Sequence, residues 1–132
     1  MSLCQQALLL LSCAVLTLCY PQTCYTKVLS MGREITERAA ELKRNPDTER
    51  CTAHLSDLYI DVHNACIMPR MRRYIALLER LPDWHCMRNR TVQKQSATAR
   101  QLHHIMAYRC HGELHFSTDD CAALEHKPRA ST

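Results

Sequence analysis

The cysteines of this chain constrain its fold more than any other feature. The sequence has nine cysteines in 132 residues, and Cys4, Cys13 and Cys19 lie in an apolar N-terminal segment that we expect to be removed. The six that remain are Cys24, Cys51, Cys66, Cys86, Cys110 and Cys121. An even number in an oxidising compartment is typical of a disulfide framework, so we expect three disulfides. The sequence leaves their pairing open, except that Cys51 and Cys66 at the two ends of one helix would lie about 22 Å apart and could not bond.

The N-terminal segment predicts a cleaved secretory signal over residues 1–19. Its apolar run, "ALLLLSCAVLTL" at 7–18, is well short of the roughly 20 residues that a membrane helix needs. Thr17 and Cys19 are small enough to precede a signal-peptidase cut before Tyr20. We therefore expect a secreted, extracellular protein without membrane insertion, with one helical domain over 20–125 and a disordered tail over 126–132.

Apolar residues recur three and four positions apart along the rest of the chain, which predicts helices. The first is expected over 24–42, the second over 49–67, the third from Pro69 to Pro82, and the fourth from about Val92 to Cys110 with Gly112 as its cap. A short helix is expected to follow Ser117 and to end at Leu124. The predicted fold is all-α, a compact disulfide-stapled four-helix bundle with a short C-terminal helix.

The stretch "DLYIDVHNAC" at 57–66 contains two carboxylates, a histidine and a thiol, which are residue types common in reaction centres. On a helix, Asp61 and His63 would point about 200° apart and could not act as a pair. Asp57, Asp61 and Asn64 would share a solvated face. With two glycines in the whole chain, no calcium-binding loop of the phospholipase kind can be formed. We therefore predict neither an enzyme nor a bound cofactor. We also predict no metal site, because Gly112 interrupts the helical spacing that His111 and His115 would need to bind one metal ion.

Two surfaces are candidate contacts for a partner. Ile60, His63 and Ile67 would lie on the side of the second helix away from its cysteine-leucine stripe, and they either pack beneath a neighbouring helix or form a contact patch. Arg70, Arg72, Arg73 and Arg80 follow in the third helix, with Arg70, Arg73 and Arg80 on one face. This face is either a solubilising surface or a site for an acidic receptor or a sulfated glycosaminoglycan.

The net charge of +4 is mildly basic, and we expect no nucleic-acid partner. Asn89-Arg90-Thr91 is an N-glycosylation sequon in the loop expected before the fourth helix. Asn89 is therefore a predicted glycosylation site.

Five motifs in order resemble the cytokine-like protein 1 family of small secreted vertebrate factors. They are "PQTCY" (21–25), "EIT" (34–36), "LYIDVHNAC" (58–66), "IM" before Cys110, and "DDCAALE" (119–125), and the resemblance includes all six cysteines. It implies a non-enzymatic signalling ligand for a cell-surface receptor of the chemokine-receptor type, linked to chondrocyte differentiation and cartilage homeostasis. The alternatives are a helical carrier of lipid or small apolar ligands, or a glycosaminoglycan-binding matrix protein.

Overall fold

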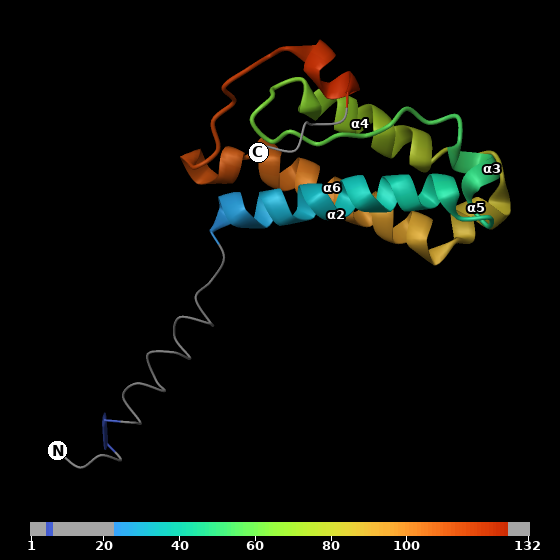
Figure 1. Cartoon of the computed structure of the whole chain (residues 1–132), viewed down its shortest axis with the longest axis horizontal. Coiled ribbons are helices and arrows are strands. Elements are labelled where there is room, and N and C mark those ends of the chain that lie inside the picture. Colours follow the sequence, from blue (N-terminus) through green and yellow to red (C-terminus); the bar gives the residue numbers. More distant parts are fainter. Residues whose placement is uncertain (1–4, 7–22, 127–132) are drawn as a thin grey trace.

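A computed structural model describes residues 5–6 and 23–126, and its described part is all-α. Most of the predicted signal segment and most of the predicted tail lie outside these residues. The elements are α2 (Cys24–Arg44), α3 (Glu49–Thr52), α4 (Ile67–Leu78), α5 (Trp84–Arg88), α6 (Arg90–Ala107) and the 3₁₀ turns η1 (Arg109–Gly112) and η2 (Cys121–Glu125). In Figure 1, α2 and α6 run side by side, and α4 lies above them in the view. None of the described helices is long and apolar enough to cross a membrane.

The long helices form where the spacing of apolar residues predicts them. The Thr23 hydroxyl accepts a hydrogen bond from the Thr26 amide at the start of α2, and Lys43 and Arg44 in its last turn suit the negative end of the helix dipole. The Asn89 side chain caps α6 by accepting from the Thr91 and Val92 amides. The predicted inward residues of these helices are buried, which confirms the periodic pattern; they are Val28, Met31, Ile35, Ala39, Leu42, Met71, Tyr74, Ile75, Leu78, Val92, Ala99, Leu102 and Met106.

The core is built around α6, which packs against both α2 and α4. Gln95 of α6 is fully buried and joins the three long helices. Its amide nitrogen donates to the Ile35 carbonyl of α2 at 2.8 Å and to the Tyr74 hydroxyl of α4 at 3.2 Å. Its oxygen accepts from Nη1 of Arg38 at 3.3 Å, and Arg38 also pairs with Glu34. Burial raises the pKa of Tyr74, so this phenol stays neutral.

The prediction of a second helix over 49–67 is wrong for most of its length. Only α3 is helical, and residues 53–66 form an irregular segment across the long helices. Leu55, Leu58 and Val62 are nevertheless buried, as the pattern requires. The described fold therefore has three long helices and two short ones, and the predicted four-helix bundle is corrected accordingly.

Tertiary pairing explains why this segment is not helical. Asn64 is fully buried rather than solvated: its amide donates to the Asp120 carbonyl at 2.7 Å and its oxygen accepts from the Cys66 amide at 3.0 Å. Ala65 donates its backbone N–H to the Thr118 carbonyl at 2.8 Å, within an isolated bridge between Asn64 and Thr118. These hydrogen bonds satisfy backbone and side-chain groups at the end of the segment, which a continuous helix into α4 would have used differently.

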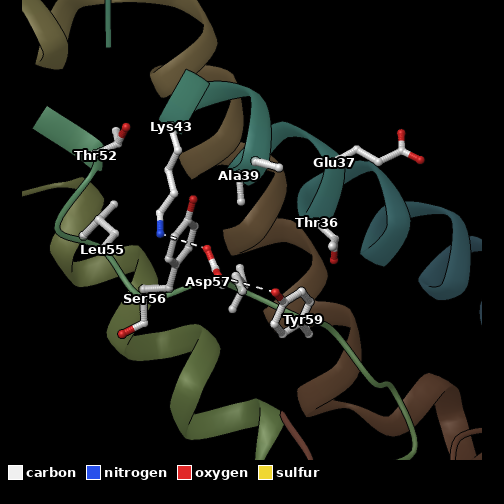
Figure 2. A pocket seen from close by; sticks show the side chains of 12 residues that line it. Thr36, Glu37, Ala39, Lys43, Thr52, Leu55, Ser56, Asp57 and Tyr59 are labelled. Carbon is white, nitrogen blue, oxygen red and sulfur yellow. Dashed lines mark hydrogen bonds and ion pairs between the residues drawn. The ribbon is translucent and has the colours of Figure 1, made fainter. Parts of the chain in front are cut away.

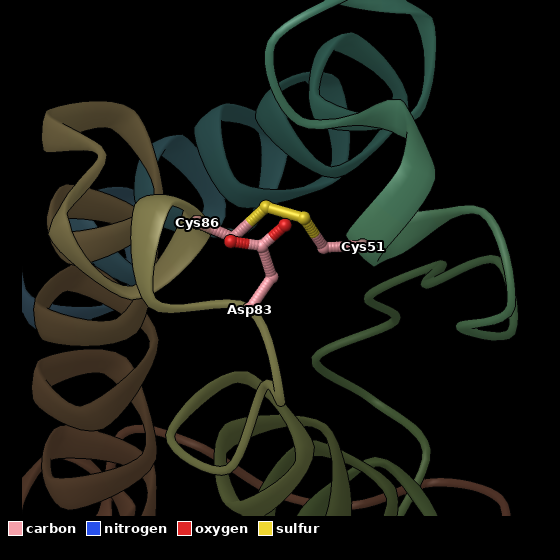
Figure 3. Close-up of side chains that lie close together, drawn as sticks. All are labelled: Cys51, Asp83 and Cys86. Atoms are coloured by element: carbon pink, nitrogen blue, oxygen red, sulfur yellow. A yellow bond between two sulfur atoms is a disulfide. The ribbon is translucent and has the colours of Figure 1, made fainter.

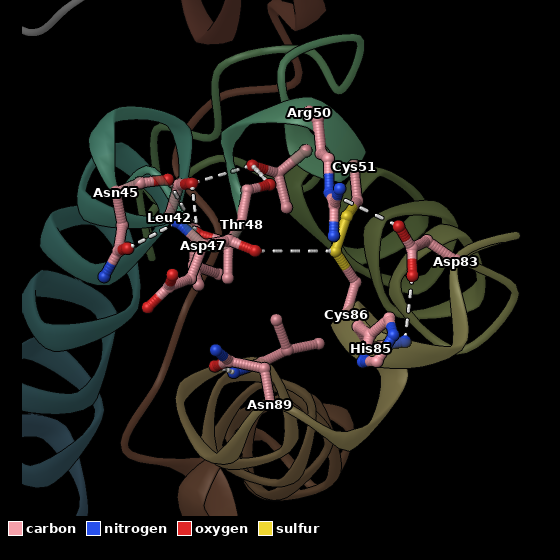
Figure 4. Close-up of a disulfide and its surroundings, with 12 residues drawn as sticks. Leu42, Asn45, Asp47, Thr48, Arg50, Cys51, Asp83, His85, Cys86 and Asn89 are labelled. Carbon is pink, nitrogen blue, oxygen red and sulfur yellow. Dashed lines mark hydrogen bonds and ion pairs between the residues drawn. A yellow bond between two sulfur atoms is a disulfide. The ribbon is translucent and has the colours of Figure 1, made fainter.

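Three disulfides use the six predicted cysteines, and they pair Cys24 with Cys110, Cys51 with Cys86, and Cys66 with Cys121. Their Cα separations of 5.4, 6.5 and 5.3 Å lie in the usual range for a disulfide. Cys51 does not pair with Cys66, although the helix used to exclude that pair is absent. The Cys51–Cys86 bridge ties α3 to α5 beneath the end of α2, where the Leu42 carbonyl accepts from the buried Thr48 and Thr52 hydroxyls (Figure 4).

The chain leaves α6 through four consecutive residues in the left-handed region, Arg109, Cys110, His111 and Gly112. Gly112 was expected to be the residue that ends the helix, but α6 ends earlier, at Ala107. The expected C-terminal helix is the 3₁₀ turn η2, and its Leu124 is buried. The Cys66–Cys121 bridge thus fixes this turn against the start of α4.

Candidate functional site

The arginines of α4 lie on two different sides of that helix. Arg70 and Arg73 line one surface groove, and Arg72 lines another. Arg80 follows the end of α4 and lines neither groove. Of the face predicted from the sequence, Arg70 and Arg73 share one groove and Arg80 lies outside it, while Arg72, which was not part of that face, lines the other groove.

The first groove, here called the arginine groove, has a volume of about 670 Å³ and lies between α4, residues 54–58 and η2. Arg70 and Arg73 face a floor that includes Leu58, Tyr74 and Leu124. These three floor residues are buried. Neither arginine forms an ion pair with any described residue. Unpaired guanidinium groups beside apolar side chains can bind a carboxylate and an apolar group of one partner segment.

Two acidic residues border the arginine groove and set its charge. Asp57 is paired with Nζ of Lys43 at 2.9 Å, and this hydrogen bond lowers the pKa of Asp57. Its charge is thus compensated within the chain. Glu125 forms no ion pair with a described residue and remains at the border of the groove beside Cys121. Two arginines against one uncompensated carboxylate leave the groove positive.

The second groove, here called the histidine groove, has a volume of about 530 Å³ and lies between α4 and α6. It is bordered by Arg72 and Glu79 on the α4 side and by Arg100, His103 and His104 on α6. Arg100 forms a two-pronged ion pair with Glu79, with Nη2 at 2.6 Å from Oε2, and this hydrogen bonding lowers the pKa of Glu79. Arg72 forms no ion pair within the described chain.

His103 is partly buried in the histidine groove, and the burial lowers the pKa of its imidazole. The nearby charges of Arg72 and His104 lower it further. Its Nε2 atom is buried and has no hydrogen-bond partner among the described residues. No local sequence pattern predicts this groove, because its two sides come from different helices, α4 and α6.

The proposed patch of Ile60, His63 and Ile67 is not a surface. Ile67 is fully buried at the start of α4, so it cannot contact a partner. Ile60 is partly buried and packs on α2, where its Cγ2 lies 3.1 Å from the Cβ position that a side chain at Gly32 would occupy. Ile67 is thus covered completely and Ile60 in part, which favours the alternative that these isoleucines pack within the fold.

His63 remains partly exposed but is held within the fold. Its Nε2 lies 2.7 Å from the Tyr25 hydroxyl of α2, and its Nδ1 lies 3.5 Å from Asp61. The expectation that Asp61 and His63 could not pair is wrong, because the segment is not helical. The chain Tyr25–His63–Asp61 fastens residues 61–63 to the start of α2.

Asn89 stands at the junction of α5 and α6 and is partly exposed. Its Oδ1 accepts from the Thr91 amide at 2.9 Å and from the Val92 amide at 3.2 Å. An N-linked glycan is attached through the nitrogen of the side chain, which these hydrogen bonds do not use. The cap geometry is therefore compatible with the predicted glycosylation.

A third pocket, between α2 and residues 52–59, bears on the alternative of an apolar-ligand carrier (Figure 2). Its volume is about 280 Å³, at the small end of ligand pockets. The Lys43–Asp57 ion pair lies inside it, and the Tyr59 hydroxyl donates to Asp57 at 3.4 Å. Charged groups in so small a space suit an apolar ligand poorly.

One cluster of ligand-type side chains also proves to be structural. Cys51, Asp83 and Cys86 lie together in Figure 3, but both sulfurs are joined in the disulfide and offer no thiolate. Asp83 accepts from the His85 amide at 2.8 Å and lies 3.4 Å from Nε of Arg50. The arrangement staples α3 to α5 and does not fit a metal.

The comparisons with known proteins agree with the sequence motifs. The family model described as cytokine-like protein 1 matches residues 4–132. The chain is 34% identical to human cytokine-like protein 1 over 106 residues, which are 80% of this chain and 74% of the human protein. No solved structure matches. The matched family is not an enzyme family, in agreement with the absence of catalytic motifs predicted from the sequence.

Proposed function

Because this chain belongs to the cytokine-like protein 1 family, we propose that it is a secreted signalling ligand that binds a cell-surface receptor. The three disulfides fit an extracellular protein. Cleavage of residues 1–19 is part of the proposal. So is the implied link to chondrocyte differentiation through a receptor of the chemokine-receptor type.

The observation that carries the receptor contact is that Arg70 and Arg73 both line the arginine groove and have no ion-pair partner among the described residues. Arg70 and Arg73 lie one turn apart on α4 and face the same groove as buried apolar side chains. An acidic receptor segment could place a carboxylate on the guanidinium groups and an apolar side chain on the floor at Leu58 and Leu124. Charge complementarity of this kind raises the association rate and selects the partner.

The test compares binding of labelled protein to chondrocytes for wild type and Arg70→Glu/Arg73→Glu. Each reversed charge should weaken binding about tenfold, so the double variant should bind about 100-fold more weakly or worse. Neither arginine forms an ion pair with a described residue, so the charge reversal removes no such contact and the variant should fold. Lys27→Glu/Arg33→Glu reverses two exposed charges on α2, outside the grooves, and serves as the matched control.

The outcomes separate receptor binding from the carrier alternative. Loss of binding in the groove variant with retention in the control supports the proposal. Equal binding of the groove variant and wild type refutes the contact at Arg70 and Arg73. A stoichiometric apolar ligand in extracts of the purified protein would favour the carrier instead.

A further inference from the structure

We propose that the histidine groove binds a sulfate group of an extracellular glycosaminoglycan, held by Arg72, His103 and His104, and that acid strengthens this binding. This inference goes beyond the proposed receptor contact and uses a different surface. The arginine groove and the histidine groove share no lining residue, because they lie on opposite sides of α4. One copy of the protein can therefore bind a receptor segment at the arginine groove and a sulfate group at the histidine groove at the same time.

The charge balance of the histidine groove leaves room for an anion. Glu79 is its acidic residue, and Arg100 already pairs with both carboxylate oxygens. The Arg72 guanidinium has no acidic partner in the described chain and lies close enough to His103 to lower that residue's pKa. A bound anion would therefore meet one uncompensated guanidinium and two imidazoles.

The shape of the groove favours a sulfate over an acidic peptide. Two small side chains, Ala76 of α4 and Ala107 of α6, line the groove together with the cationic groups. They leave space for an oxyanion but offer no deep apolar pocket for an anchoring side chain. The disulfides fit an extracellular protein, and the polyanions abundant outside cells are sulfated glycans.

The state of His103 makes the binding proton-dependent. In the free protein, burial and the charges of Arg72 and His104 oppose protonation of this imidazole, and its Nε2 has no partner among the described residues. A sulfate bound at Arg72 in the same groove would offset the repulsion between that guanidinium and the protonated ring, so the bound state favours protonation of His103. Since binding then takes up a proton, affinity must rise as the pH falls. The other groups that face His103 are Glu79 and Arg100, which stay paired, and Tyr108 at the end of α6.

The test measures binding of a heparin hexasaccharide, and of the same sugar without sulfates, at pH 7.4 and 5.5. Arg72→Gln and His103→Gln should each weaken binding of the sulfated sugar about tenfold at pH 5.5. His103→Gln should also remove much of the gain on acidification. Arg80→Gln makes the same charge change outside both grooves and should bind nearly as wild type.

A measurement on the wild-type protein avoids dependence on variants that fold poorly. NMR titration of the His103 ring, with and without saturating hexasaccharide, should show a higher pKa in the bound state. An unchanged pKa refutes the proposal. So does equal binding of the desulfated sugar, or a loss in Arg72→Gln no greater than in Arg80→Gln. None of these results depends on receptor binding, so this inference and the proposed function can fail separately.

Discussion

The buried amide of Gln95 gives the most quantitative prediction about stability. Gln95→Leu keeps a side chain of similar size but removes three hydrogen bonds, to the Ile35 carbonyl, the Tyr74 hydroxyl and Arg38. All three partners are buried, so water cannot easily replace the amide. At about 1 kcal/mol for each bond, the variant should lose about 3 kcal/mol of unfolding free energy.

Urea unfolding of the oxidised protein, followed by circular dichroism, measures this loss. For a denaturant slope of about 1.5 kcal/mol/M, the midpoint should fall by about 2 M. Gln93→Leu is the matched control, because Gln93 is exposed on the same helix and makes one long contact of 3.4 Å to the Met87 carbonyl. It should change stability by less than about 0.5 kcal/mol.

A double-mutant cycle tests whether the loss comes from the proposed hydrogen bonds. Tyr74→Phe should cost about 1 kcal/mol in the wild-type protein and clearly less in the Gln95→Leu background, because the bond between the two side chains is then already absent. If Gln95→Leu is as stable as wild type, or if the two substitutions are additive, Gln95 does not join the three helices as described.

Three further predictions concern the disulfide at the C-terminal turn, the pH dependence of stability and the sequon. Cys66→Ser/Cys121→Ser removes the disulfide that closes a loop with a sequence separation of 55, and it should lower the unfolding free energy by about 4 kcal/mol. Proteolysis near residues 117–126 should become faster, and unchanged protease resistance would contradict this prediction. Because the pKa of His103 is lowered in the fold, the unfolded chain takes up that proton first, so stability should fall as the pH drops below about 6.5. His103→Gln should reduce this slope in urea unfolding at pH 7.5 and 5.5, and an identical slope would argue against the burial of His103. Asn89→Asp should abolish a glycosidase-sensitive shift in gel mobility yet keep the cap of α6. Asn89→Ala should lose both the glycan and the cap, and its unfolding free energy should be about 1 kcal/mol lower than that of Asn89→Asp.

The sequence predicts most of the helical core, because burial there follows one helix at a time. The stripes of α2, α4 and α6 place Ile35, Ile75 and Leu102 inward, and all three are buried. The same reasoning fails at 53–66, where Leu55, Leu58 and Val62 keep helical spacing but lie in an irregular segment. The competing hydrogen bonds there come from residues 117–120, about 55 positions away, and no local pattern reveals them.

The sequence predicts the arginines of the candidate site, but not the grooves that they line. The cluster of arginines at 70–73 is visible in the sequence, and Arg70 and Arg73 do share a groove. Arg72 lies off that face, as its helical position predicts, but the groove that it lines depends on how α4 packs against α6 and is not visible in the sequence. The sequence also fails to predict the burial of Ile67, because the predicted second helix ended at this residue, whereas in the structure Ile67 begins α4 and packs in the core.

The most direct test of the receptor proposal is saturable binding of the labelled, glycosylated mature protein to chondrocytes before and after heparinase treatment. We predict binding that remains saturable after the enzyme, with reduced apparent affinity because the glycan contact at the histidine groove is lost. Binding that disappears entirely with the glycans would contradict the receptor proposal and leave a matrix-binding protein in its place.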